Sequence, residues 1–200
     1  MKMRSMLAVL AVAVFSTGAY GISIEQADMD AGSVFLNFDE LAAGTVVSNQ
    51  YAGYGLTISG TLGNNGSGAA STVTAEDTGG SYSDPIYIGQ PNNSWDGSVI
   101  FDFTGVNVTQ FGAYLVDSAS SWLSLYDSSN TLIETIFGSG SVYDWVGADT
   151  GGVNIARAIF SGDFYAVDDV MFNAKVPEPG SLILFLAGLL GVVVSRRRIG

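Results

Sequence analysis

The residues of this chain best suited to chemistry are carboxylates, and one pair stands out by its place in the sequence. Asp168 and Asp169 lie within 166–172, where apolar residues alternate as they do in a β-strand. The alternation predicts that Asp168 lies on the same face of the strand as Val170 and Phe172, which is the face of a protein core. A carboxylate that faces a core must be paired with a cation, hydrogen-bonded or bound to a metal ion.

Cations for this aspartate pair are scarce. Only two bases, Arg157 and Lys175, lie between the two terminal segments described below. Calcium is therefore a reasonable partner, because it is a hard cation that takes six to eight oxygen ligands, carboxylates among them. If the first and last strands come together, Asp39 or Glu40 would complete a structural calcium site with the pair. The alternative is that Asp168 lies at a strand end, where water solvates it or it caps a turn.

A second group of side chains is suited to binding a ligand without reacting with it. The segment 81–96 concentrates aromatic rings, amides and carboxylates in a stretch that contains two prolines. Rings that offer an apolar face beside hydrogen-bonding groups suit a sugar ring. The alternative is that these rings fill the core or cover its edge. The candidate ligand-binding residues are Tyr82, Tyr87, Trp95, Trp122 and Trp145.

Several catalytic classes are excluded by residue types that the sequence lacks. It contains no cysteine and no histidine, so thiol chemistry is excluded and no serine has a plausible base. Two Asp-Thr-Gly triplets, beginning at Asp77 and Asp149, are of the kind that aspartic proteases use, but a second glycine follows each and favours a glycine-rich turn. A glycosidase with two carboxylates stays an alternative because acids are abundant. We expect a protein without enzymatic activity.

The elements that would position these residues are short strands. No stretch between the terminal segments keeps a helical period, whereas alternating runs recur with Gly, Asn, Asp and Ser between them. This pattern predicts an all-β fold, an antiparallel β-sandwich of the jelly-roll kind, with a hairpin turn at 127–130. The predicted strands are 33–38, 55–59, 71–75, 86–89, 98–103, 109–116, 122–126, 131–137, 153–160 and 166–172.

The charge of the chain limits its partners. Of the 19 acids, 18 lie within 22–175 against two bases, so this part has a net charge of −16. Such a surface repels nucleic acid and anionic lipid, and it favours divalent cations, neutral polymers or cationic partners. Acidity that merely keeps an exported protein soluble explains most of these residues equally well. We expect no nucleic-acid partner.

The N-terminal segment has the order of a secretory signal peptide. Lys2 and Arg4 precede a short apolar run, and a series of small residues follows it. Cleavage after Gly21 would give a signal peptide of residues 1–21, which we expect to form a helix, and cleavage after Ala19 is the nearby alternative. Either cut leaves one exported domain, without disulfides, that ends near Lys175.

The C-terminal segment, 176–200, has three parts in a fixed order. A Pro-Glu-Pro tripeptide is followed by the apolar run 182–194 and then by three arginines. Thirteen apolar residues at about 1.5 Å each span roughly 20 Å, which is less than the ~30 Å hydrocarbon core of a bilayer. Arginines are retained on the cytoplasmic side and help to hold such a segment. The residues of this signal are Pro177, Glu178, Pro179, Arg196, Arg197 and Arg198.

These three parts together resemble the PEP-CTERM sorting signal of Gram-negative bacteria. The resemblance implies that an exosortase, a membrane-embedded cysteine transpeptidase, reads the tripeptide and removes the tail. It implies export through the inner membrane, a C-terminal hydrophobic helix that is inserted before processing, and a mature protein at the cell surface or outside the cell. An ordinary membrane anchor is the alternative, although an anchor has no need of two prolines around a glutamate.

For the domain itself, the sequence predicts a surface or matrix protein that associates with exopolysaccharide in a biofilm. Its candidate sites are the aromatic residues named above. The alternatives are a secreted glycan-active enzyme and a purely structural surface protein.

Overall fold

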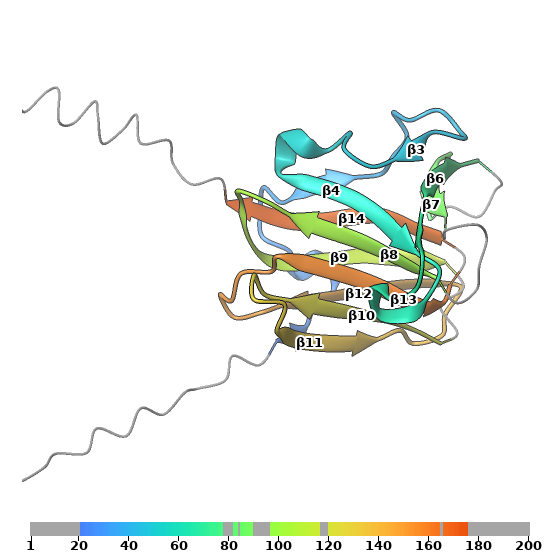
Figure 1. Ribbon diagram of the computed structural model, residues 1–200. Coiled ribbons are helices and arrows are strands. Elements are labelled where there is room, and N and C mark those ends of the chain that lie inside the picture. The colour runs from blue at the N-terminus through green and yellow to red at the C-terminus, as the bar shows by residue number, and fades with distance from the viewer. Residues whose placement is uncertain are drawn as a thin grey trace, which may run out of the picture.

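Two antiparallel β-sheets pack face to face in the computed structural model, and Figure 1 shows them as two layers. The structure describes residues 21–77, 82, 83, 85–89, 97–116, 120–164 and 166–175. The predicted all-β sandwich is confirmed. The predicted signal helix and C-terminal hydrophobic helix lie outside the described residues, apart from Gly21.

The larger sheet has eight strands and the smaller has six. The order of the larger sheet is β1 (Ile22–Ser23), β12 (Tyr143–Asp149), β9 (Asn107–Val116), β14 (Ala166–Lys175), β7 (Tyr87–Gly89), β6 (Val73–Glu76) and β3 (Val46–Val47), with β2 (Val34–Leu36) paired to β14 beside this path. The order of the smaller sheet is β11 (Leu132–Phe137), β10 (Ser120–Tyr126), β13 (Arg157–Asp163), β8 (Ser98–Phe103), β4 (Leu56–Thr61) and β5 (Ala70–Ser71).

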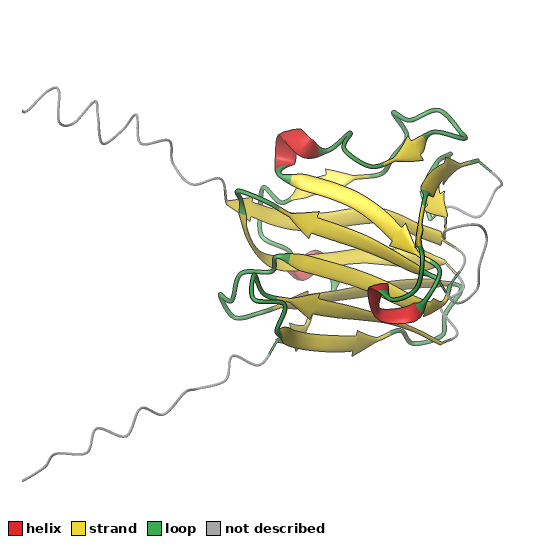
Figure 2. Cartoon of the chain, in the orientation of Figure 1, coloured by secondary structure: helices red, strands yellow, loops and turns green. Residues whose placement is uncertain are grey.

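Helical structure in the described residues is limited to three short 3₁₀ turns, which stand out against the strands in Figure 2. They are η1 (Gln26–Asp28), η2 (Ala52–Tyr54) and η3 (Asn64–Gly66). None of these turns has the length or the apolar character needed to cross a membrane.

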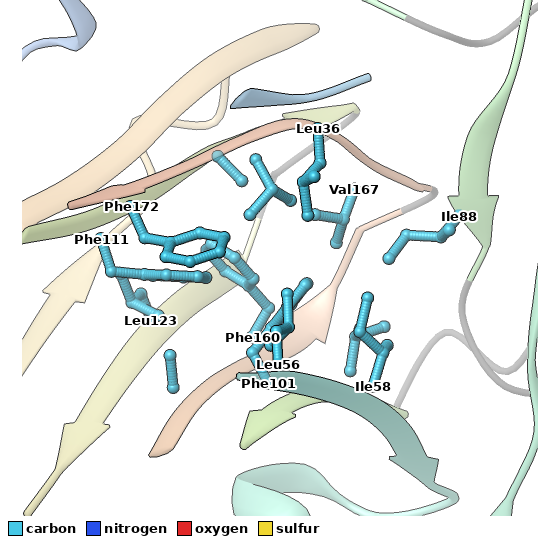
Figure 3. Packing of buried hydrophobic residues seen from close by; sticks show 14 of the residues in the cluster. Leu36, Leu56, Ile58, Ile88, Phe101, Phe111, Leu123, Phe160, Val167 and Phe172 are labelled. Atoms are coloured by element: carbon cyan, nitrogen blue, oxygen red, sulfur yellow. The ribbon is translucent and has the colours of Figure 1, made fainter. Parts of the chain in front are cut away.

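The core lies between the two sheets, and a group of phenylalanine rings packs within it among aliphatic side chains. Phe101 and Phe160 come from the six-stranded sheet, and Phe111 comes from the eight-stranded sheet. The ring centroids of Phe101 and Phe111 are 5.2 Å apart, and those of Phe111 and Phe160 are 5.8 Å apart. Figure 3 shows these rings pointing toward one another. Such tilted ring pairs add to the stabilisation that burial provides.

The alternation predicted for β10 is confirmed. Leu123 and Leu125 are fully buried in the core, whereas Trp122 and Tyr126 lie on the opposite, outer face of the sheet. The predicted hairpin after this strand is also present, because β10 pairs antiparallel with β11.

The prediction that Asp168 faces the core together with Val170 and Phe172 is wrong. Asp168 is opposite Tyr114 on β9, and its neighbour Val167 is opposite the core residue Leu115, so Asp168 lies on the outer face of the eight-stranded sheet. The cause is a β-bulge at Asp169, whose φ is +49°. One extra residue shifts the alternation by one, so Val170 returns to the core while Asp168 does not.

Candidate functional site

An open groove lies on the outer face of the six-stranded sheet, where β10 and β11 form a hairpin. It has a volume of about 430 Å³. Side chains that alternate outward along the two strands build it, and pairing across the ladder places Trp122 opposite Phe137, and Tyr126 opposite Leu132. The seven residues that line this β10–β11 groove are Asn65, Trp122, Ser124, Tyr126, Leu132, Thr135 and Phe137.

The hairpin turn sets the register that builds the groove. Asp127 Oδ1 accepts hydrogen bonds from the backbone N–H groups of Ser129 and Thr131, at 2.8 Å each. Asn130 takes the left-handed conformation, with φ of +59°, that asparagine tolerates in turns. A bulge near the turn shifts the pairing by one residue, so that Tyr126 meets Leu132. The exposed face of the hairpin is therefore apolar at both ends.

The 3₁₀ turn η3 contributes one polar side chain to the groove. Trp122 Nε1 donates a hydrogen bond to Asn65 Oδ1 at 2.9 Å. The turn itself is fixed to the sheet, because the backbone N–H of Asn65 donates to Ser161 Oγ at 2.8 Å and that of Gly66 donates to Ser98 Oγ at 3.2 Å. Asn65 has a left-handed backbone, with φ of +56°. The orientation of the indole is thus set by a rigid neighbour.

Among the residues that the structure describes, no acidic and no basic side chain lines the groove. The nearest base along the strand ladder is Arg157, which is opposite Tyr126 on β13. Its Nε lies 2.6 Å from Asp102 Oδ1, so its charge is already matched by that carboxylate. What the groove offers a ligand is three aromatic rings, one leucine, three hydroxyls and one amide.

Two of the predicted ligand-binding residues lie on the other side of the molecule. Trp145 on β12 alternates with the core residues Val146 and Ala148, so it faces outward from the eight-stranded sheet. The Tyr82 ring stacks on Tyr114 with centroids 3.5 Å apart, and the Tyr114 and Trp145 centroids are 5.4 Å apart.

These rings are used for packing within the protein. Trp145 Nε1 donates to the backbone oxygen of Ile24 at 2.9 Å. Burial, together with the neighbouring Tyr82 hydroxyl, raises the pKa of Tyr114 to about 12. Because these rings lie on the eight-stranded sheet and Trp122 lies on the six-stranded sheet, the structure does not bring Tyr82 and Trp145 to one surface with Trp122.

Of the remaining two predicted ligand-binding residues, the structure describes only Tyr87, which does not line the groove. Tyr87 is fully buried and packs with Val116 and Ala166, so its ring has no face left for a ligand. Trp95 lies outside the described residues. Phe137, Tyr126 and Asn65 line the groove without having been predicted as ligand-binding residues.

The aspartate pair accepts hydrogen bonds from the protein itself. Asp168 is fully buried, and its Oδ2 lies 2.9 Å from the backbone nitrogen of Ser83 and 3.3 Å from Ser83 Oγ. Its Oδ1 accepts the backbone N–H of Asp169 at 2.8 Å. Ser83 Oγ also lies 2.7 Å from Asp169 Oδ1. These donors are partners of the aspartate pair that the sequence does not predict.

The two other predicted calcium ligands have different surroundings. Asp39 Oδ1 accepts the backbone N–H of Ile86 at 3.1 Å. Burial raises the pKa of Asp169, and the negative charge of Asp39 raises it further. Glu40 Oε1 instead accepts the Tyr51 hydroxyl at 2.7 Å. Within the described ranges, no three acidic side chains form a group that could hold a metal ion.

Calcium at this cluster stays a prediction, and melting curves of the full chain test it. On this hypothesis, calcium at 100 times its dissociation constant stabilises the fold by about 2.7 kcal/mol, which raises the melting temperature by about 5–10 °C. Magnesium at the same concentration should do much less, because it requires tight octahedral geometry. Equal shifts with the two cations would leave the hydrogen bonds to Ser83 and Asp169 as sufficient partners for Asp168.

The stability of the protein should depend on the protonation of Asp168. Burial raises the pKa of Asp168 to about 6, above the value of about 3.9 for an unfolded chain. The folded state therefore binds the proton more tightly, so this contribution is complete below about pH 4 and is lost as the pH rises through 6. We expect Asp168 to make the free energy of unfolding about 2 kcal/mol larger at pH 4 than at pH 7.

Denaturant unfolding at the two pH values measures this difference. Asp168→Asn cannot titrate at this position, so its stability should lack the Asp168 part of the pH dependence. Relief of the overall negative charge at low pH acts on both proteins and cancels in the comparison. The same pH dependence in the parent and in Asp168→Asn would contradict the raised pKa.

The second Asp-Thr-Gly triplet forms a turn at the end of β12. Asp149 Oδ1 accepts the backbone N–H of Gly151 at 2.8 Å, and its Oδ2 accepts Gln110 Nε2 at 2.9 Å. The Thr150 hydroxyl lies 3.0 Å from the backbone oxygen of Thr109. This triplet is therefore held as a glycine-rich turn. Part of the first triplet lies outside the described residues.

The comparisons with known proteins bear on the C-terminal segment. Residues 175–198 match the family model described as the PEP-CTERM protein-sorting motif. The C-terminal segment of this chain is a PEP-CTERM sorting motif. The match includes the Pro-Glu-Pro tripeptide and the three arginines, which lie outside the residues that the structure describes. The predicted resemblance is confirmed.

The PEP-CTERM motif determines how the protein is handled. It indicates an exported protein, with an exosortase as its processing partner and with C-terminal membrane anchoring before processing. The motif says nothing of what the sandwich binds.

Comparisons of the whole chain are less informative. No curated protein matches it. Among solved structures, it is similar to the enzymatically active domain of tailspike protein 4 of bacteriophage CBA120, at 14% identity and a TM-score of 0.34, and the match covers 66% of this chain and 21% of that one. It is also similar to the K1 cleaved adhesin domain of Lys-gingipain from Porphyromonas gingivalis W83, at 18% identity and a TM-score of 0.27, with coverage of 72% and 99%. Neither TM-score reaches 0.5, so neither similarity bears on function.

Proposed function

We propose that this protein is a non-enzymatic component of the cell surface or extracellular matrix, and that it binds exopolysaccharide in the β10–β11 groove. The observation that carries the proposal is the groove itself, an open hollow of about 430 Å³ on an outer sheet face with aromatic rings at both ends. The PEP-CTERM motif supports a destination where polysaccharide is present. Residues 22–175 would be the mature domain after removal of the signal peptide.

The shape and chemistry of the groove suit a sugar chain. Trp122 and Tyr126 are four residues apart on one strand, which separates their rings by about 13 Å along β10. An extended groove of this length accommodates more than one sugar ring. Aromatic faces cover the apolar faces of the sugars, while Ser124, Thr135 and Asn65 are placed to hydrogen-bond to their hydroxyls.

Binding without turnover is favoured because the groove contains no carboxylate. Glycoside hydrolysis generally requires two carboxylates on either side of the scissile bond. A smaller neighbouring hollow, of about 190 Å³, does contain Asp102 and Asp127. Asp102 is paired with Arg157, and Asp127 accepts backbone N–H groups of the hairpin turn, so both carboxylates have structural roles. The secreted glycan-active enzyme remains the alternative function.

The proposal is tested by truncating the tryptophan ring at one end of the groove. Trp122→Ala should lower the affinity for a bound polysaccharide at least tenfold, or about 1.4 kcal/mol, because a buried tryptophan contact is among the strongest in an interface. A glycan array finds the polysaccharide, and calorimetry measures the affinity.

Two further variants form a matched pair for this test. Phe137→Ala removes a 73% exposed ring at the groove, and Phe35→Ala removes a 49% exposed ring on β2 in the other sheet. Only Phe137→Ala should weaken binding. Equal affinity for the parent and Trp122→Ala would overturn the proposal, and release of new reducing ends from the bound polysaccharide would favour the enzyme.

A further inference from the structure

We propose that the ligand of the β10–β11 groove is a neutral glycan, and that the side-chain amide of Asn65 recognises one of its hydroxyl groups. This inference rests on the function proposed above, and it adds the chemical class of the ligand and a residue that determines specificity.

The charge distribution favours a neutral glycan over an acidic one. Residues 22–175 have a net charge of −16, which repels a chain of uronic acids or sulfated sugars before contact. Recognition of a carboxylate or sulfate generally requires an arginine or lysine. No base in the described part of the chain lines the groove, and the neighbouring Arg157 is already paired with Asp102. An acidic glycan would therefore find repulsion at long range and no counter-ion at short range.

In the side-chain amide of Asn65, the oxygen Oδ1 is hydrogen-bonded within the protein, whereas the nitrogen Nδ2 is available to a ligand. Its Oδ1 accepts the Trp122 indole N–H at 2.9 Å, which turns Nδ2 away from the indole. No group in the described part of the chain accepts a hydrogen bond from Nδ2. A side-chain amide nitrogen carries two N–H donors, and the hydroxyl oxygen of a sugar is a suitable acceptor. Asn65 thus offers donors beside the ring on which a sugar would stack.

The position of this donor is fixed before any ligand arrives. The backbone N–H of Asn65 is held by Ser161 Oγ, and Ser98 Oγ lies 2.9 Å from Ser161 Oγ and 2.8 Å from the backbone oxygen of Gly63. The two serines are buried. Because the turn is already ordered, binding loses little conformational entropy at Asn65. A rigid donor beside a rigid indole discriminates between glycans by the position of their hydroxyls.

The test compares glycan classes and one substitution on the full chain, purified in a detergent without a sugar headgroup. The parent should bind neutral glucans, mannans or xylans at least tenfold more tightly than alginate, polygalacturonate or hyaluronan. Asn65→Asp keeps an acceptor for the Trp122 indole and tolerates the left-handed backbone, but it removes both N–H donors. It should lower the affinity for the neutral glycan at least tenfold.

Asn130→Asp is the matched control for the added charge. Asn130 also has a left-handed backbone, with φ of +59°, and lies in the hairpin turn outside the lining of the groove. The Asn130→Asp variant should bind the neutral glycan with the same affinity as the parent. Asn65→Gly, which accepts a positive φ without strain, removes the whole amide and decides the case if Asn65→Asp fails to fold.

The outcomes separate this inference from the function on which it rests. Equal binding of acidic and neutral glycans would overturn the assignment of a neutral ligand. Unchanged affinity in both Asn65 variants would overturn the role of Asn65. In either case glycan binding would remain established. Failure of the parent to bind any glycan would overturn the proposed function itself.

Discussion

Replacing Pro177, Glu178 and Pro179 with alanine will abolish removal of the C-terminal segment and leave the protein in the inner membrane. Proline holds itself and the residue before it in an extended conformation, the form in which a processing enzyme takes a substrate. Alanine instead favours continuation of the apolar helix expected for 182–194. The variant therefore loses both the extended backbone and the one charged side chain of the tripeptide.

Intact-mass analysis of protein from a host with an exosortase measures this effect. The parent should lack the residues after about Pro179, and the triple variant should retain Arg198. Alanine at Val176, Gly180 and Ser181 makes the same number of changes around the tripeptide and should leave processing intact. A parent protein at the cell surface that still carries Arg198 would show that the tail is an ordinary anchor.

Substitution of Gly162 by alanine should destabilise the sandwich by about 3 kcal/mol or more and lower the melting temperature by roughly 6–12 °C. Gly162 has a φ of +100°, and a Cβ there would collide with the backbone oxygen of Ser120 and lie 2.9 Å from the Cα of Ser121. Backbone atoms of the paired strand β10 cannot give way as a flexible side chain can. The Gly162 N–H also donates to Asn64 Oδ1 at 3.0 Å, so the η3 turn should loosen and glycan binding should weaken.

Gly152→Ala separates the collision from the backbone strain. Gly152 has almost the same φ, +101°, but no atom lies within 4 Å of the position of its Cβ. It should therefore cost only the strain, about 1–2 kcal/mol, and leave the groove unaffected. Thermal melts of the two variants and the parent, with calorimetric titration of the glycan, make the comparison. Equal losses of stability in Gly162→Ala and Gly152→Ala would mean that the collision with Ser120 does not contribute to the destabilisation.

The strands that sequence patterns predict best are those whose alternation is complete. Val99, Phe101 and Phe103 alternate without interruption, and β8 spans the predicted range, 98–103. β12 is not among the predicted strands because Gly147 interrupts its short apolar run and a glycine-rich turn follows at 149–152. In the fold, Gly147 is opposite Gly112 on β9, and both leave room for the Trp145 indole on the sheet surface. A glycine that makes room for a ring gives the same sequence signal as one that bends the chain. The two-residue strands β1 and β3, also not predicted, are too short to show a period.

The β10–β11 groove depends on contacts between residues far apart in the chain, which leave no local pattern in the sequence. The outward face of Trp122 followed from alternation along β10, but its neighbour Phe137 depends on the register that the hairpin sets. Asn65 reaches the groove only because η3 folds back onto Ser98 and Ser161, which are far from it in sequence. The partners of Asp168 were missed because backbone N–H groups belong to every residue except proline and leave no mark in a sequence.

The place of β14 in the sheet determines how the sandwich responds to a pulling force. The sorting tail begins directly after β14, which is hydrogen-bonded to β9 along one edge and to β2 and β7 along the other. If a partner binds in the groove while the tail is in the membrane, tension on that partner is carried to the tail through β14. A strand with neighbours on both edges must shear several hydrogen bonds at once to move, whereas an edge strand such as β11 can peel away one bond at a time. Survival under tension depends on the rate of unfolding rather than on equilibrium stability. The part of β14 that is paired on both edges, within 166–172, should therefore slow mechanical extraction more than an edge strand would.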